Sequence, residues 1–181
     1  MSTLPLLTTV RERARSIGRR YAGDQPRPLP GYLLLMAGYA GLGGSLLLAA
    51  RRRQSVAGEG IGAAELALTT VSTYRLSRLL TKDAVTSPLR APLTKFDERG
   101  MPAELNEEVA PRLVGHPVAH AVGELVTCPF CVGQWVATVL VAGHVLDPRL
   151  ARLVTSVLTA AAGAEALQFV HAGLQRLEPG H

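Results

Sequence analysis

The chain has 181 residues, enough for one domain, and a formal net charge of +5. Hydrophobic residues make up 48% of it but aromatic residues only 4%, so small and aliphatic side chains supply its apolar content, as in packed transmembrane helices. The basic residues flank apolar segments, which fits anchoring at an anionic membrane surface better than nucleic-acid binding. Two cysteines do not make a disulfide framework.

Residues 1–30 form a basic N-terminal tail. Apolar residues recur there at helical spacing from Leu7 to Tyr21, with arginines between and around them. This pattern predicts an amphipathic helix on an anionic lipid surface, with a solvated, partly disordered tail as the alternative. The stretch Asp24–Pro30 ends any such helix before the first apolar segment.

Residues 31–181 are predicted to form an all-α, polytopic membrane domain. Four segments have roughly the length and apolarity of a transmembrane helix, although the second carries Glu65 and a run of Thr and Ser. They lie at about 31–50, 60–80, 129–146 and 152–174. Pro129 is expected at the first position of the third helix, and Asp147 with Pro148 should begin the fourth in a tight hairpin.

Small residues repeat every four positions in the first span, at Ala37, Gly41 and Ser45. Such a face lets another helix approach closely. We therefore expect it to pack within the chain, between copies in a homo-oligomer, or against a partner membrane protein.

Residues 83–127 form the longest polar stretch. The prolines of Ser87–Phe96 indicate an extended or turning segment, and a short helix is predicted over Pro102–Val109. The glutamates there are expected on a solvated face. Pro117 should begin a helix that runs to Val126.

Five potential ligands gather before the third span: His116, His120, Glu124, Cys128 and Cys131. Three interpretations of this cluster stay open. The cysteines close a helix end; or they bind zinc or another transition metal, with His120 and either His116 or Glu124; or they form a thiol–disulfide pair. His120 and Glu124 lie one helical turn apart, so they also fit a structural hydrogen bond.

Four polar residues interrupt the apolar spans: Glu65, Gln134, His144 and Glu165. A carboxylate at mid-membrane depth is costly, which makes Glu165 a candidate functional residue. The alternative is that Glu165 is protonated or bonded to Gln134, Thr138 or His144.

The distribution of basic residues predicts orientation. With four crossings and the N-terminus inside, 14 Arg and Lys residues lie inside and five outside. The positive-inside rule then places both termini in the cytoplasm, although Arg51–Arg53 oppose it. Cys128 and Cys131 would lie at the cytoplasmic face, where disulfides are disfavoured.

Two segments, Thr73–Leu93 and Gly123–Ala137, resemble the bacterial family Domain of Unknown Function 1360, which includes a small spore-associated membrane protein. The matching elements are a Cys-Pro-x-Cys cluster with Trp135 downstream and a series of charged residues, whose arginines are expected at the membrane surface: Arg75, Arg78, Asp83 and Arg90. The resemblance extends over about Ile61–Leu174. It implies a small helical protein of the bacterial cytoplasmic membrane and supplies no catalytic residues.

The leading functional hypothesis is a non-enzymatic assembly or interaction component. One alternative is a metal-binding membrane protein that uses His120, Cys128 and Cys131. Another is a membrane thiol–disulfide oxidoreductase at Cys128-Pro-Phe-Cys131, by analogy with enzymes that generally need a second cysteine pair, which this chain lacks.

Overall fold

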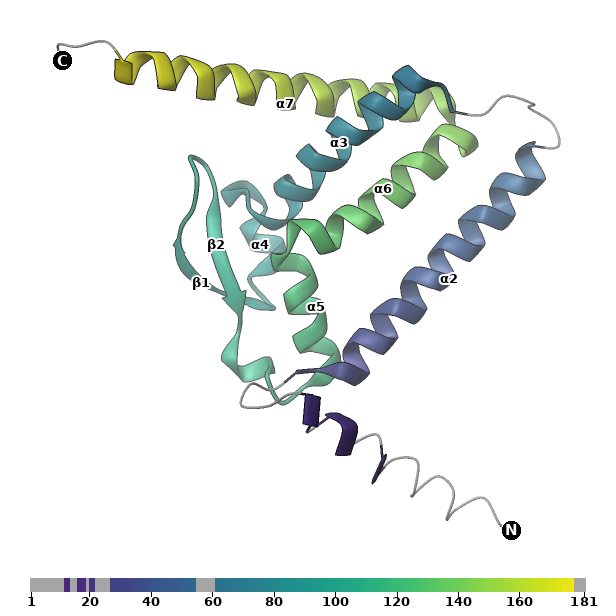
Figure 1. Ribbon diagram of the computed structural model, residues 1–181, viewed down its shortest axis with the longest axis vertical. Helices are drawn as coiled ribbons and strands as arrows, with labels where there is room; N and C mark the ends of the chain where they lie inside the picture. The colour runs from purple at the N-terminus through teal and green to yellow at the C-terminus, as the bar shows by residue number, and fades with distance from the viewer. Residues whose placement is uncertain (1–11, 14–15, 19, 22–26, 55–60, 178–181) are drawn as a thin grey trace.

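The computed structural model describes residues 12–13, 16–18, 20–21, 27–54 and 61–177. These residues are mostly helical, with a small two-stranded sheet (Figure 1). In chain order the elements are α2 (Leu29–Gln54), α3 (Ala63–Thr81), the 3-10 turn η1 (Ala84–Thr86), α4 (Ser87–Arg90), β1 (Thr94–Arg99), β2 (Leu105–Val109), the 3-10 turn η2 (Pro111–Leu113), α5 (Pro117–Thr127), α6 (Pro129–Leu146) and α7 (Pro148–Leu177).

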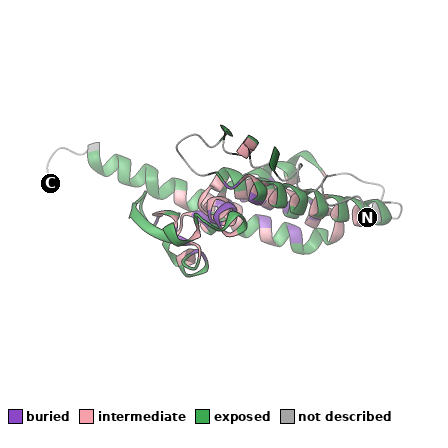
Figure 2. Cartoon of the chain, turned by 90° about the horizontal axis from the view of Figure 1, so that it is seen from below, coloured by how far each residue is buried: buried purple, intermediate pink, exposed green. Residues whose placement is uncertain are grey.

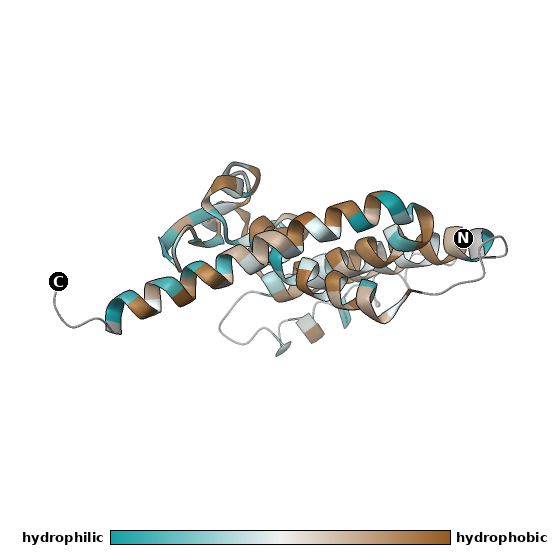
Figure 3. Ribbon diagram, turned by 90° about the horizontal axis from the view of Figure 1, so that it is seen from above, coloured by the Kyte–Doolittle hydropathy of each residue, from teal (hydrophilic) through white to brown (hydrophobic). Residues whose placement is uncertain are grey.

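Three helices, α2, α6 and α7, are long and apolar enough to cross a membrane. They contain the predicted spans at 31–50, 129–146 and 152–174, which are confirmed as helices of the required length and apolarity. None of the residues in the apolar window of α2 is buried in the structure, and few are in α7. Apolar side chains therefore cover much of the molecular surface, as Figure 3 shows along these helices.

The segment predicted as the second span forms the helix α3, but α3 is not apolar enough to count among the three. Its central turns carry Thr and Ser rather than aliphatic residues, and its buried positions are all polar: Thr69, Ser72, Ser77 and Thr81. Of the four predicted crossings, the described residues therefore support three by length and apolarity, and the crossing at 60–80, for which a tilted or re-entrant helix was the alternative, stays a prediction.

Proline and side-chain caps set the helix ends as predicted. Pro129 begins α6, and its N-cap is Cys128, whose Sγ accepts a hydrogen bond from the amide of Cys131 at 3.3 Å. Pro148 begins α7, and the Asp147 carboxylate accepts from the amide of Leu150 at 3.1 Å. Helix α5 also starts at its predicted proline, Pro117.

The polar stretch contains an antiparallel hairpin, which corrects the all-α prediction. Strands β1 and β2 pair from Thr94↔Val109 to Arg99↔Leu105, with an irregularity between Phe96 and Glu98. The turn between the strands includes Ala103 at a φ of 67°. The predicted helix at Pro102–Val109 is absent because residues 105–109 bond to β1, while Ser87–Arg90 forms the short helix α4.

Buried residues concentrate where α3, α6 and α7 pack together (Figure 2). Helix α2 joins this group at one end through α5, where Gly31 lets the two helices approach closely, and further along through an edge-to-face contact between Tyr39 and Trp135. In Figure 1, α2 and α6 run toward the end of the molecule where α3 and α7 begin.

Two predictions about the N-terminal region have different outcomes. The tail helix is described only in short helical pieces at 12–13, 16–18 and 20–21, and its remaining residues, including Leu7 and Val10, lie outside the described residues.

The small-residue face of α2 is exposed at Ala37, Gly41 and Ser45, so it does not pack within the described chain.

Replacing Gly31 with Ala should destabilise the α2–α5 contact. An added Cβ would lie 2.1 Å from the carbonyl oxygen of Pro117 and 2.6 Å from the Cβ of Ala121, so the helices would have to separate. Overpacking of this kind costs about 1–3 kcal/mol, which thermal unfolding in detergent would detect. Gly41→Ala is the control, because its added Cβ meets nothing within 4 Å. Equal melting temperatures for the two variants would contradict this assignment.

Candidate functional site

Helix α3 carries a buried polar face that its own backbone satisfies. The hydroxyls of Thr69, Thr73, Ser77 and Thr81 each donate to the carbonyl four residues earlier, at 2.6–2.8 Å. A hydroxyl that bonds back to its own helix leaves no buried donor unpaired. Small hydroxyl residues also let neighbouring helices approach closely, so α3 packs against both α6 and α7.

Hydroxyls also join α3 to α7. Ser72, which is fully buried, donates to the carbonyl of Thr155 at 2.9 Å and lies 3.2 Å from the hydroxyl of Thr159. Thr159 in turn donates to the carbonyl of Leu68 at 3.3 Å. At the start of both helices, Arg152 pairs with Glu65 at 3.1 Å. The two helices are thus held together by polar contacts over about two turns.

His144 joins α6 to α3, and its hydrogen bond fixes its tautomer. Its Nε2 lies 3.0 Å from the hydroxyl of Thr69, which already donates to the carbonyl of Glu65. The hydroxyl therefore accepts, and Nε2 carries the hydrogen. The other ring nitrogen, Nδ1, is buried without a hydrogen-bond partner among the described residues.

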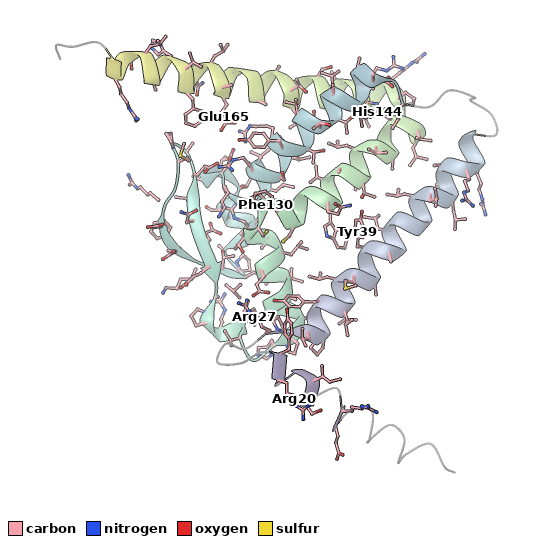
Figure 4. The ribbon with its side chains drawn as sticks, viewed as in Figure 1. Arg20, Arg27, Tyr39, Phe130, His144 and Glu165 are labelled. Carbon is pink, nitrogen blue, oxygen red and sulfur yellow. The ribbon has the colours of Figure 1, made fainter. Side chains whose placement is uncertain are left out.

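Arg75 is the centre of a charged cluster at the other end of α3. Its guanidinium donates to Asp83 at 2.9 Å and lies 3.5 Å from Glu165 of α7. It therefore links α3, the segment that follows it, and the last apolar helix. The predicted neighbours of Glu165 are wrong: Gln134 and Thr138 bond to Tyr39 at 2.8 and 2.7 Å, and His144 bonds to Thr69 (Figure 4).

Arg78 and Arg90 extend this cluster to the hairpin. Arg78 forms an ion pair with Glu104, and its guanidinium lies over the ring of Tyr74. Arg90 is only 2% exposed and donates to both carboxylate oxygens of Glu107, at 2.9 and 3.0 Å. Its remaining hydrogen bonds go to the carbonyls of residues 80 and 83 and to the hydroxyl of Thr86.

The backbone completes the connection between α3 and the hairpin. The amide of Ala84 donates to the carbonyl of Ala103 at 2.9 Å, and that of Leu105 donates to the carbonyl of Lys82 at 2.8 Å. Asp83 and Glu104 form an isolated bridge. We call the ion pairs made by Arg75, Arg78 and Arg90 the arginine latch. Arg75 and Arg78 join α3 to Asp83 and Glu104, Arg75 also reaches Glu165 of α7, and Arg90 joins β2 to α4.

Glu124 forms a second polar centre, between α5 and the start of α2. It accepts a hydrogen bond from the hydroxyl of Tyr32 and lies 3.3 Å from Arg27 and 3.6 Å from His120. His120 is buried, and its Nδ1 has no partner among the described residues. This centre ties the segment before α2 to α5.

The five predicted ligands fall into separate groups. Cys128 and Cys131 are free thiols with their sulfurs 2.7 Å apart, and His120 pairs with Glu124. His116 is the exposed N-cap of α5. Within residues 12–54 and 61–177, so far as these are described, no group of three or more His, Cys, Asp or Glu residues is placed to hold a metal ion. The ligands separate because Glu124 turns toward Tyr32 and Arg27.

Glu104 and Glu107 are site residues that sequence reasoning misassigned to a solvated face. Their side chains are only 7% and 5% exposed, and they pair with Arg78 and Arg90 of the predicted series. Charge balance is the sequence signal that could have identified these two glutamates. Arginines close to apolar segments need partners, and three carboxylates lie close by in the chain at residues 104–108.

Comparisons with known proteins confirm the predicted resemblance. The family model described as "Protein of unknown function (DUF1360)" matches residues 68–171. The chain is also similar to the protein named "Sporulation protein YjcA" of Bacillus subtilis (strain 168). The two are 31% identical over 87 residues, which cover 48% of this chain and 73% of the relative. No solved structure matches the chain. The matched range contains the arginine latch, the cysteine pair and most of α3, α6 and α7.

Replacing Arg90 with Gln should destabilise the hairpin strongly. The substitution leaves Glu107 buried without its charge partner, which typically costs about 3–5 kcal/mol. The matched control is Lys95→Gln, because Lys95 pairs with Glu108 at 3.5 Å in an exposed position on the same two strands. That variant should lose less than about 1 kcal/mol. Unfolding of both variants in detergent, followed by circular dichroism, makes the comparison, and equal losses would refute a special role for the buried pair.

Proposed function

This chain belongs to the DUF1360 family of proteins of unknown function, and from that premise we propose that it is a non-enzymatic assembly or interaction component of the bacterial cytoplasmic membrane. The observation that carries the proposal is the arginine latch. A folded polar unit, residues 82–127, is paired through Asp83 and Glu104 with two arginines of α3, and one of these, Arg75, also lies 3.5 Å from Glu165 of α7, a helix apolar enough to cross a membrane. The name of the Bacillus relative refers to sporulation and names no enzymatic reaction.

We place α3 across the membrane with α2, α6 and α7. Its polar face is buried against α6 and α7, and its outward positions include the exposed residues Leu66 and Val71. A helix with its hydroxyls satisfied internally is tolerated in lipid when other helices cover it. In this arrangement both termini and residues 82–127 lie on the cytoplasmic side, in agreement with the count of 14 basic residues against five.

The partner surface we propose lies on the cytoplasmic unit, where α3 gives way to α4. Val85 and Leu89, four residues apart, are 77% and 74% exposed. We call them the apolar corner. Exposed apolar residues on a polar unit mark an interaction site, either for a second copy of the chain or for a partner membrane protein. The latch holds this corner at a fixed position relative to the helices.

A photo-cross-linking side chain at Val85 should give a protein adduct of discrete mass in native bacterial membranes. The matched control is Val157, which is 61% exposed on α7 and faces lipid in the proposed arrangement, so that position should give none.

Protease tests the orientation. Added to inside-out vesicles it should cut within residues 94–109, and added to intact spheroplasts it should not. Cleavage from the outside would overturn the orientation.

The Val85 cross-linking experiment also separates assembly from thiol–disulfide exchange. Two sulfurs in contact at an exposed helix start also suit exchange, in which Cys128 and Cys131 give two electrons and two protons to a partner disulfide. An assembly role predicts that the Val85 adduct survives replacement of both cysteines by serine. Loss of that adduct, together with a mixed disulfide trapped by Cys131→Ser, would replace the assembly proposal with an exchange reaction.

A further inference from the structure

One stripe of α6 is left uncovered along most of the helix. Phe130 is 90% exposed, Gln134 is exposed, Ala137 is partly exposed and Val141 is 37% exposed. These four residues follow one another at spacings of four, three and four, which is the spacing of a seam between two paired helices. We call this stripe the α6 seam. His144 lies on a different face and bonds to α3, so the packing of α3 leaves the seam open.

The amide of Gln134 is only half satisfied within the chain. The hydroxyl of Thr138 donates to the backbone carbonyl of Gln134 at 2.9 Å, so it accepts from the hydroxyl of Tyr39, 2.7 Å away. Tyr39 has then given its hydrogen, and it accepts from Nε2 of Gln134 at 2.8 Å. This chain of bonds fixes the orientation of the amide. Its oxygen accepts no hydrogen bond from any residue that the structure describes.

Gln134 lies inside the hydrocarbon in the membrane placement given above. Helix α6 has 18 residues and is therefore about 27 Å long, close to the thickness of the apolar core. Gln134 comes five residues after Pro129, about 8 Å along the helix. Its bond to Tyr39 keeps the side chain from turning to the membrane surface. An exposed amide at this depth is costly unless another protein group pairs with it.

We propose that a second copy of the chain packs on the α6 seam, with α6 beside the same helix of its partner. The amide of Gln134 then bonds to Gln134 of the partner subunit. The proposal rests on the membrane placement given under the proposed function. It assigns an interface to α6, whereas the sequence predicted one on the small-residue face of α2.

The symmetry of a membrane dimer favours a second copy as the occupant. Copies insert in the same orientation, so a two-fold axis between them runs along the membrane normal. Their α6 helices then lie parallel, and each seam residue meets its own counterpart. A glutamine amide carries both a donor and an acceptor, so two copies of it complement each other. The seam carries no charged residue, so no like charges oppose each other.

Other occupants satisfy the seam less well. Lipid chains cover apolar residues but offer no hydrogen bond to the Gln134 amide. The small-residue face of α2 makes no comparable demand, because its polar member, Ser45, donates to the carbonyl of Leu42 at 2.8 Å. A single polar residue in an otherwise apolar seam also fixes the register of two helices, since any shift leaves both amides unpaired.

Thiol cross-linking in native membranes locates the interface. In a chain with Cys128 and Cys131 replaced by serine, Ala137→Cys should give a disulfide-linked dimer on mild oxidation, because counterparts across a seam lie within disulfide reach. The matched control is Val139→Cys. Val139 is 52% exposed two residues further along, on another face of the same helix, and should give no dimer.

A second pair of variants tests the amide. Gln134→Leu should raise the dissociation constant of the dimer in detergent about threefold to thirtyfold, the range for one side-chain hydrogen bond between membrane helices. Tyr39→Phe is its control, because it removes the bond within the chain and keeps the amide of Gln134. That variant should dimerise at least as well as the wild type. Analytical ultracentrifugation measures both constants.

Each outcome decides for or against the proposal. Equal dimer yields from Ala137→Cys and Val139→Cys, or none from either, would refute the seam. A dissociation constant unchanged by Gln134→Leu would refute the amide pair, and a different protein captured at position 137 without any dimer would give the seam to another partner. If Gln134→Leu fails to fold, the cross-linking result still decides. None of these results changes the protease digestion or the Val85 adduct, so this inference and the proposed function can fail separately.

Discussion

The structure depends on burying a polar helix among apolar ones. Helix α3 turns threonine and serine toward α6 and α7, and an unpaired hydroxyl there would cost several kcal/mol in an apolar environment. The cost is avoided because each central hydroxyl has an acceptor, either on its own helix or across the interface to α7. Small polar side chains then become an advantage, since they allow close packing without large apolar residues.

The same requirement, that buried polar groups find partners, shapes the polar unit of residues 82–127. Three arginines at or just after the end of α3 are partly or fully buried, and each needs a carboxylate. The hairpin supplies two of these carboxylates, and the third arginine bonds to Asp83 and Glu165. Pairing these charges therefore does two things at once. It folds residues 82–109 onto α3, and it links this unit to α7. A surface at the end of α3, such as Val85 and Leu89, is held rigidly as a result.

The sequence predicted the features that depend on neighbouring residues. Local patterns predict the apolar helices α2, α6 and α7, the proline starts of α5, α6 and α7, and the Asp147 cap. The hairpin was not predicted, because Glu104, Glu107 and Glu108 have the spacing of one helix face. The pairing of residues 105–109 with residues 94–99 is invisible in local patterns. The predicted partners of Glu165 were wrong for a similar reason. Its partner in the structure is Arg75, which lies 90 residues earlier in the chain.

The cysteine cluster shows the same limit. Spacing placed five ligands within 16 residues, yet Glu124 bonds to Tyr32 and Arg27, which come from the start of the chain. Long-range contacts thus decide which polar groups meet, and here they divide the cluster into a Cys128–Cys131 pair and a Glu124 centre. Local sequence therefore predicts the chemistry of each group but does not predict which other groups lie next to it.

Hydrogen–deuterium exchange of the full-length protein in lipid nanodiscs tests the central claim most directly. If the ion pairs of the arginine latch fasten the hairpin to α3, amides of β1 and β2 should be protected about as strongly as those at the end of α3. Arg90→Gln should then expose both regions together, because they open as one cooperative unit. Fast exchange of the wild-type hairpin beside a protected α3 would contradict the account, since it would show that the latch does not hold.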